Sequence, residues 1–398
     1  MIVPRRQPPV VSHVTASAVV AAARVAARRY AGRVDRGDEV VRSTLSTRYD
    51  ARAVALTDSG TSALVIALRL AAPRGTVALP AYGCVDLIAA AVRAKGRVRL
   101  YDIDPATLSP DLDSVRAALA RGADAVVVAH VYGDPADLPG VRALADAAGA
   151  RVIEDAAQHA GGRLSGTRLG AFGPLSVMSF GRGKGTTGGR GGALMATAAA
   201  GAATIGAVEA AGRAMAAPAA GWSEVVIAGA QWVLGRPGTY GIAASLPGLH
   251  LGETIYHPAA EPAALSRAAA ALVRSGLPHT DAERLARAAV AESLAGELAR
   301  VPSFRGVTAI PGSNPGYLRL AVLDEAGRRA APQLGVVRSY PRPLGEEAEI
   351  APIIHRGEPD TPGAREICQK LFTLPVHEYV TLGDERQIVE WASAVAMG

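Results

Sequence analysis

A lysine within a glycine-rich segment is the residue whose surroundings point most directly to chemistry. Lys184 lies between Gly183 and Gly185 and has no acidic neighbour nearby in the sequence that would make it an ordinary surface ion pair. Upstream, the acidic pair Glu154 and Asp155 follows an apolar run. A lysine amine can attack a carbonyl carbon, and a carboxylate can hold a positive charge close to it. Lys184 and Asp155 are therefore a candidate catalytic pair.

The elements that must position this pair are short strands. The apolar runs at 150–153, interrupted only by Arg151, and at 175–180 each indicate a buried strand, and Asp155 and Lys184 follow them. In an open α/β sheet, functional groups gather at the carboxyl ends of the strands. A third site of this kind is the turn at 57–60, between a strand at 53–56 and a helix at 61–71.

The turn at 57–60 leads into a helix N-terminus, where free backbone N–H groups can bind an anion. Capping of the helix by Ser59 or Thr61 is the ordinary alternative. Taken alone, Asp155 could likewise cap a helix and Lys184 could be a solvated loop residue. Together, the three sites match an aldehyde cofactor that carries a phosphate and a pyridine nitrogen. The lysine would form the Schiff base and move protons, the carboxylate would keep the ring nitrogen protonated, and the turn would hold the phosphate.

Strands and helices alternate along the first half of the chain, which predicts an α/β fold with a mostly parallel sheet and right-handed crossovers. Further strands are expected at 76–79, 98–103 and 125–130, and helices between 84 and 94 and at 112–120 and 141–148. The segment 193–251 gives no confident assignment. Beyond it we expect Ala-rich helices over 262–300, strands near 307, at 317–322 and at 335–338, and helices at 362–372 and 383–397.

Composition excludes several classes of protein. The chain has 398 residues, of which 49% are hydrophobic and 20% charged, which indicates a globular protein of two domains. The net charge of +6 comes from scattered arginines, and aromatic residues make up only 4%, so we expect no nucleic-acid partner. Cys84 and Cys368 lack metal-ligand spacing, so no metal is expected. Without a signal peptide or a long apolar run, a cytoplasmic protein with no membrane contact is expected.

The motifs resemble those of the DegT/DnrJ/EryC1/StrS aminotransferases, pyridoxal-phosphate enzymes of fold type I that mostly aminate nucleotide-linked keto sugars. The resemblance is dense over about residues 50 to 195 and looser over 335 to 395. Its most specific part is EDAAQ at 154–158 followed by SF at 179–180 and Lys184. Further matching segments are SGTSAL at 59–64, PAY at 80–82, VRLYDID at 98–104, HVYGDPAD at 130–137, 166–173, GG at 191–192, YPRPL at 340–344 and LPVH at 374–377.

The resemblance implies a large domain with a seven-stranded type of sheet sandwiched by helices, followed by a smaller α+β C-terminal domain. We place an N-terminal arm at 1–30, the large domain at 31–255 and the small domain at 256–398. The family works as homodimers with sites at the subunit interface. An amino-acid donor, glutamate or glutamine, would supply an amino group to a keto group on a sugar or similar metabolite.

The resemblance also assigns roles to individual residues. Lys184 would be the Schiff-base lysine and proton carrier, and Asp155 would pair with the pyridinium nitrogen. Gln158 would lie near the phenolic oxygen of the cofactor. The remaining predicted cofactor-binding residues are Gly60, Thr61, Ser62 and Ser179 around the phosphate, with Tyr82 and Cys84 beside the ring.

Three features depart from the family pattern. Cys84 stands where the family usually stacks an aromatic ring on the cofactor, and Tyr82 would share its face if both lay in a strand. No GYN-like segment is present, and 250–258 occupies roughly that place. Arg182 and Arg190 flank the lysine. They either point to solvent or partner acidic groups, or they recognise an anionic substrate group.

Further hypotheses about the site and the reaction remain. His130, at a predicted strand end, is a tentative substrate residue near the floor of the site. The same cofactor could run an elimination, decarboxylation or cyclisation on an anionic substrate. The protein could also be a non-catalytic member of the family, because the stacking ring and the GYN-like segment are both missing.

Overall fold

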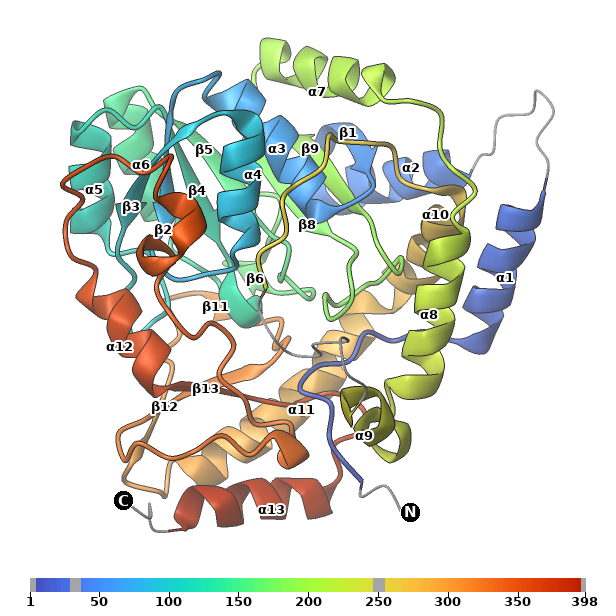
Figure 1. Ribbon diagram of the computed structural model, residues 1–398, viewed down its shortest axis with the longest axis vertical. Helices are drawn as coiled ribbons and strands as arrows, with labels where there is room; N and C mark the ends of the chain where they lie inside the picture. Colours follow the sequence, from blue (N-terminus) through green and yellow to red (C-terminus); the bar gives the residue numbers. More distant parts are fainter. Residues whose placement is uncertain (1–4, 29–36, 246–254, 395–398) are drawn as a thin grey trace.

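A seven-stranded sheet forms the centre of the molecule (Figure 1). The computed structural model describes residues 5–28, 37–245 and 255–394. Strand β9 runs opposite to both of its neighbours, and the other six strands share one direction. In order across the sheet, the strands are β1 (Ala51–Thr57), β9 (Gly192–Thr197), β8 (Leu175–Ser179), β5 (Arg151–Asp155), β4 (Ala125–Ala129), β2 (Thr76–Pro80) and β3 (Arg97–Tyr101).

The central strands are rich in buried apolar residues because helices cover both of their faces. In β4, for example, the sequence AVVVA is buried at its first four positions. The helices that connect the strands are α3 (Gly60–Ala71), α4 (Asp86–Ala94), α5 (Leu112–Ala120) and α6 (Leu138–Ala148). Helix α3 packs on α4 and on strands β5, β8 and β9. It therefore brings its N-terminus to the carboxyl edge of the strands that carry Asp155 and Lys184.

The C-terminal part of the chain forms a second group of elements with its own apolar core, which includes Phe304, Phe372 and Ile388. Its three-stranded sheet has the order β10 (Phe304–Gly306), β12 (Leu320–Asp324), β13 (Leu371–Leu374). In a second small sheet, β6 (Arg163–Leu164) lies between β11 (Ser313–Asn314) and β7 (Thr167–Arg168). The helices of this group are α11 (Thr280–Leu298), α12 (Pro362–Lys370) and α13 (Leu382–Ser393), whereas α10 (Arg267–Gly276) packs against helices outside it.

Helices lie in the segment 193–251, for which the sequence allowed no confident assignment. They are α7 (Ala202–Ala214), α8 (Trp222–Leu234) and α9 (Pro237–Ser245). At the N-terminus, α1 (Ala16–Ala27) packs against α8 and α10, and α2 (Gly37–Tyr49) packs against β1 and α10 (Figure 1). Within the described residues, no helix combines the length and apolarity needed to cross a bilayer.

The predicted fold class, α/β with a mostly parallel sheet, is confirmed. Two expectations about elements were wrong, and one strand was not predicted. Strand β9 was missed, because GALMAT merges with the small residues that follow it. Residues 335–338 form only isolated bridges, at Val336 and Val337, and the helix expected over 362–372 gives way to β13 at Leu371. The domain boundaries after residues 30 and 255 lie in or beside ranges outside the described residues and stay predictions.

Candidate active site

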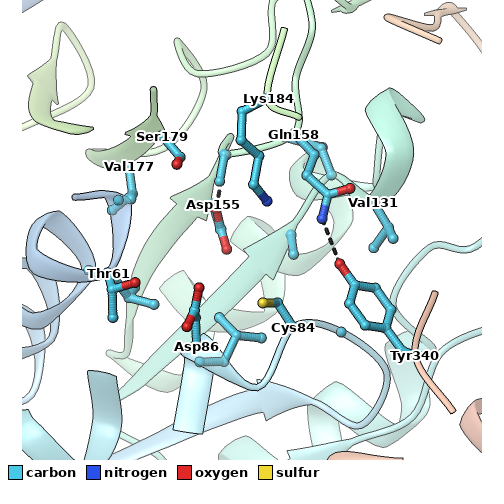
Figure 2. A pocket seen from close by; sticks show the side chains of 17 residues that line it. Thr61, Cys84, Asp86, Val131, Asp155, Gln158, Val177, Ser179, Lys184 and Tyr340 are labelled. Atoms are coloured by element: carbon cyan, nitrogen blue, oxygen red, sulfur yellow. Dashed lines mark hydrogen bonds between the residues drawn. The ribbon is translucent and has the colours of Figure 1, made fainter. Parts of the chain in front are cut away.

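A cavity opens where the strands β4, β5 and β8 end and the helices α3 and α4 begin (Figure 2). Eight of the predicted site residues line it, together with Asp86 and Tyr340, which the sequence interpretation did not single out. The eight are Gly60, Thr61, Cys84, His130, Asp155, Gln158, Ser179 and Lys184. The remaining four, Ser62, Tyr82, Arg182 and Arg190, are not part of the lining.

Lys184 is one of only three lysines in the chain. Lys95 is exposed at the end of α4, and Lys370 is paired with Glu325 at 2.6 Å. Lys184 points into the cavity (Figure 2), and no carboxylate of the described residues forms an ion pair with it. Its loop is packed tightly: Gly183 has a left-handed φ of 72°, and a Cβ there would lie 2.9 Å from a methyl group of Val10. The amine of Lys184 is therefore held inside the cavity, where a ligand would bind.

Asp155 ends β5 and faces the same cavity. Its Oδ1 accepts a hydrogen bond from the backbone N–H of Ala157 at 2.9 Å, and its Oδ2 has no donor among the described residues. Burial raises the pKa of this carboxyl above its usual value, and the Ala157 N–H and the charge of Lys184 act in the opposite direction. A cationic N–H group in the cavity would supply both the missing donor and the missing charge.

Glu154 points away from the cavity and is fully buried. Its two oxygens accept hydrogen bonds from the Nε2 of His130 at 3.0 Å and from three backbone N–H groups of the loop 170–173 at 2.5 to 2.8 Å. The Nδ1 of His130 accepts from the backbone N–H of Ala136 at 3.0 Å, so Nε2 carries the ring hydrogen. Both nitrogens of His130 are occupied. His130 does line the cavity, as expected for a residue near the floor of the site, and its contact with a substrate stays a prediction.

The N-terminus of α3 provides the predicted anion site. The hydroxyl of Ser59 accepts from the backbone N–H of Ser62 at 3.0 Å and donates to the Ser62 hydroxyl at 2.9 Å. Ser62 is therefore used in the helix cap, which explains why it does not reach the cavity. Gly60 and Thr61 do reach it, opposite Ser179. A Cβ at Gly60 would lie only 2.7 Å from the Cβ of Ser179, so glycine is required where the helix meets β8.

The placement of Tyr82 beside Cys84 on one strand face was wrong. Strand β2 ends at Pro80 and the next three residues bend, so strand alternation does not apply. Tyr82 is buried, and its hydroxyl bonds to that of Tyr132 at 2.6 Å. Cys84 does line the cavity, and burial raises the pKa of its thiol to about 12. Cys84 is therefore a neutral thiol at neutral pH.

The two arginines near the lysine, Arg182 and Arg190, are both exposed and lie outside the cavity lining.

Asp86 was missed although it is an acidic residue at the first position of α4, a place favoured by the helix dipole. Its exposed carboxylate points toward the cavity between Thr61 and Cys84 (Figure 2). Part of the predicted 250–258 segment, residues 250–254, lies outside the described residues.

Comparison with known proteins places the chain in a family. The model of the DegT/DnrJ/EryC1/StrS aminotransferase family matches residues 31–392, and the chain belongs to this family. Solved structures share the fold: an aminotransferase TlmJ from Streptoalloteichus hindustanus has a TM-score of 0.74 at 21% identity, covering 99% of this chain and 98% of that one. The PLP-form of the putative sugar aminotransferase Spr1654 from Streptococcus pneumoniae also has a TM-score of 0.74, at 16% identity, covering 98% of each chain.

Curated relatives match more locally. A UDP-N-acetyl-3-dehydro-alpha-D-glucosamine 3-aminotransferase from Acidithiobacillus ferrooxidans is 35% identical over 124 residues, which are 31% of this chain and 34% of the relative. An L-glutamine:2-deoxy-scyllo-inosose aminotransferase from Streptomyces kanamyceticus is 36% identical over 139 residues, 34% of this chain and 33% of the relative. The matches thus span about a third of the length of these relatives. The family implies pyridoxal phosphate as cofactor. Among the residues described, no group of three or more His, Cys, Asp or Glu side chains could hold a metal ion.

Proposed function

We propose that the protein is a pyridoxal-phosphate-dependent aminotransferase. It moves an amino group from glutamate or glutamine to the keto group of a sugar or a related small metabolite. The observation that carries this proposal is the pairing of Lys184 with Asp155 in one cavity at the carboxyl edge of the sheet (Figure 2). Of the three lysines in the chain, Lys184 is the one in the cavity lining, where the aldehyde group of the cofactor would bind.

The side chains of the cavity fit this cofactor. Asp155 Oδ2 has no donor among the described residues and suits a protonated ring nitrogen. The start of α3 at Gly60 and Thr61, with Ser179 opposite, suits a phosphate. Lys184 would bind the aldehyde carbon. When bound, the cofactor withdraws electrons from the carbon that carries the transferred amino group.

In this arrangement Lys184 has a second task. Its Nζ would hold the proton that leaves the amino-bearing carbon and return it, because Lys184 is the one lysine in the cavity lining. Asp155 remains ionised while a positive charge lies next to it, and so keeps the opposite charge in place. The chain's own residues thus supply the base, the counter-ion and the anion site.

The substrate class rests on the relatives. Their printed names describe aminotransferases that act on a dehydro amino sugar and on an inosose, the latter with glutamine as donor. Both acceptors are polyhydroxylated rings with a keto group, which supports this class for the present chain. We further propose a homodimer, as the family resemblance implies. Light scattering would then give twice the chain mass of 40.6 kDa.

An amino-transfer assay tests the proposal. The purified protein is loaded with pyridoxal phosphate and mixed with glutamine or glutamate and a panel of keto sugars and keto cyclitols. We expect the aminated acceptor to appear in equal amount to the oxo acid formed from the donor, both followed by mass spectrometry. Lys184→Ala should abolish both products, and Lys370→Ala, which removes a surface ion pair, should retain them.

Other outcomes separate the competing functions. Release of ammonia or carbon dioxide without an aminated acceptor would indicate elimination or decarboxylation. No product with any donor or acceptor, together with no cofactor binding, would indicate a non-catalytic protein. Either result would contradict the proposed aminotransferase.

A further inference from the structure

The wall of the cavity near Gln158 contains a hydrogen-bond network whose donors and acceptors can be assigned. The Oε1 of Gln158 accepts from the backbone N–H of Tyr132 at 3.1 Å, and a backbone N–H can only donate. The amide nitrogen of Gln158 therefore points the other way, and it donates to the hydroxyl oxygen of Tyr340 at 2.8 Å. The orientation of the amide follows from these two partners. The second N–H of the amide has no acceptor among the described residues.

Tyr340 reaches this wall from the C-terminal part of the chain, 182 residues away from Gln158. Its ring lies edge-on to Tyr82, with centroids 5.2 Å apart, and is stacked on Tyr132 at 6.1 Å. The side chain is 8% exposed and lines the cavity. Burial raises the pKa of its hydroxyl well above the usual value, so the hydroxyl keeps its proton at any physiological pH.

The proton of the Tyr340 hydroxyl is also without an acceptor in the described part of the chain. The hydroxyl already accepts from Gln158, so its own O–H is free to donate. Figure 2 shows the Tyr340 hydroxyl and the Gln158 amide meeting at the edge of the cavity, on the side away from Thr61. One corner of the cavity therefore offers two hydrogen-bond donors, one N–H and one O–H, and no negative charge.

We propose that Tyr340 is a cofactor-binding residue that, together with Gln158, holds the phenolic oxygen of the bound pyridoxal phosphate. The inference rests on the proposed function, because that cofactor carries an anionic oxygen of the required kind. Hydrogen bonds to an anionic oxygen favour its deprotonated form. Tyr340 thereby lowers the pH at which the bound cofactor loses its proton, and it ties the C-terminal part of the chain to the cofactor.

A spectroscopic titration tests this role without measuring turnover. Wild-type protein and Tyr340→Phe are loaded with pyridoxal phosphate, and the visible absorption of the bound cofactor is recorded as a function of pH. Phenylalanine keeps the ring packing and removes only the donor. We expect the titration midpoint of Tyr340→Phe to rise by about one pH unit or more, and its dissociation constant for the cofactor to rise about tenfold.

Tyr132→Phe is the matched control. It removes a hydroxyl from the same tyrosine cluster, but that hydroxyl bonds to Tyr82 and not to the cavity. We expect its midpoint and dissociation constant to equal those of the wild type. An unchanged midpoint in Tyr340→Phe, or an equal shift in Tyr132→Phe, would overturn the role of Tyr340 while leaving the proposed function intact. A wild-type protein that shows no cofactor absorption would overturn both.

Discussion

At the scale of single residues, the cavity holds two charged groups, Asp155 and Lys184, for which the described residues supply no ion-pair partner. Asp155 is half-buried, has one backbone donor and lies near the charge of Lys184. Glu154, the next residue along the strand, has four donors and points away from the cavity. Two adjacent carboxylates in one strand thus have opposite tasks, because successive side chains point to opposite faces.

Asp155→Asn tests the carboxylate that faces the cavity. Asparagine keeps the shape and removes the charge that would stabilise a protonated ring nitrogen. We expect kcat for amino transfer to fall about 10²- to 10³-fold, the loss typical of one preorganised electrostatic partner. Steady-state kinetics measure this, and Asp146→Asn, on the exposed surface of α6, is the control. Wild-type kcat in Asp155→Asn would exclude the pairing with the ring.

At the scale of elements, the sequence predicted well those parts that local pattern determines. The strands at Asp155 and Ser179, and the helix that starts at Gly60, lie where their apolar runs placed them. Eight predicted residues line one cavity: the element pattern indicated Asp155, Lys184 and the turn before α3, and the family resemblance supplied others such as Gln158.

Non-local contacts account for what was missed. Strand β9 is defined by pairing with β1 and β8, from distant parts of the chain, and not by a distinctive composition. Tyr340 enters the cavity from the C-terminal part of the chain, and no spacing in the sequence indicates that. Tyr82 was misplaced because strand β2 ends at Pro80, before both Tyr82 and Cys84, so the alternation argument does not apply to them.

Glu154→Gln tests how the loop at 170–173 is held to β5. Both oxygens of Glu154 accept hydrogen bonds, so a glutamine would turn an NH₂ group toward at least one backbone donor. We expect a loss of about 3 kcal/mol in the free energy of unfolding, measured by urea denaturation. The control Asp113→Asn, at an exposed site on α5, should cost less than about 1 kcal/mol. Equal losses in both variants would show that the buried network is not essential.

At the scale of the whole molecule, buried ionisable groups link stability to pH. His159 is one such group: its Nδ1 donates to the carbonyl of Ala156 at 2.8 Å, and its Nε2 accepts from the hydroxyl of Tyr49 at 3.0 Å. Burial lowers the pKa of His159 to about 4. In the unfolded chain the same ring titrates near its usual value of 6.5. Between these values the unfolded state binds the extra proton, so the contribution of His159 to stability decreases as the pH falls from about 6.5 toward 4.

The free energy of unfolding is compared between wild type and His159→Gln, because the contributions of the other titrating groups cancel in this difference. From pH 7 to pH 5 the wild type should lose about 2 kcal/mol of unfolding free energy relative to the variant. Urea denaturation at the two pH values measures the difference. If the difference is the same at both pH values, His159 is not held neutral in the folded protein.

The central claim, that Lys184 binds the cofactor, can be measured by chemical trapping. The protein is loaded with pyridoxal phosphate, reduced with borohydride to fix the lysine linkage, digested and examined by mass spectrometry. The chain offers only Lys95, Lys184 and Lys370. We predict one cofactor-derived mass addition per chain, located on the peptide that contains Lys184. An addition on Lys95 or Lys370 instead, or no addition at all, would contradict the account.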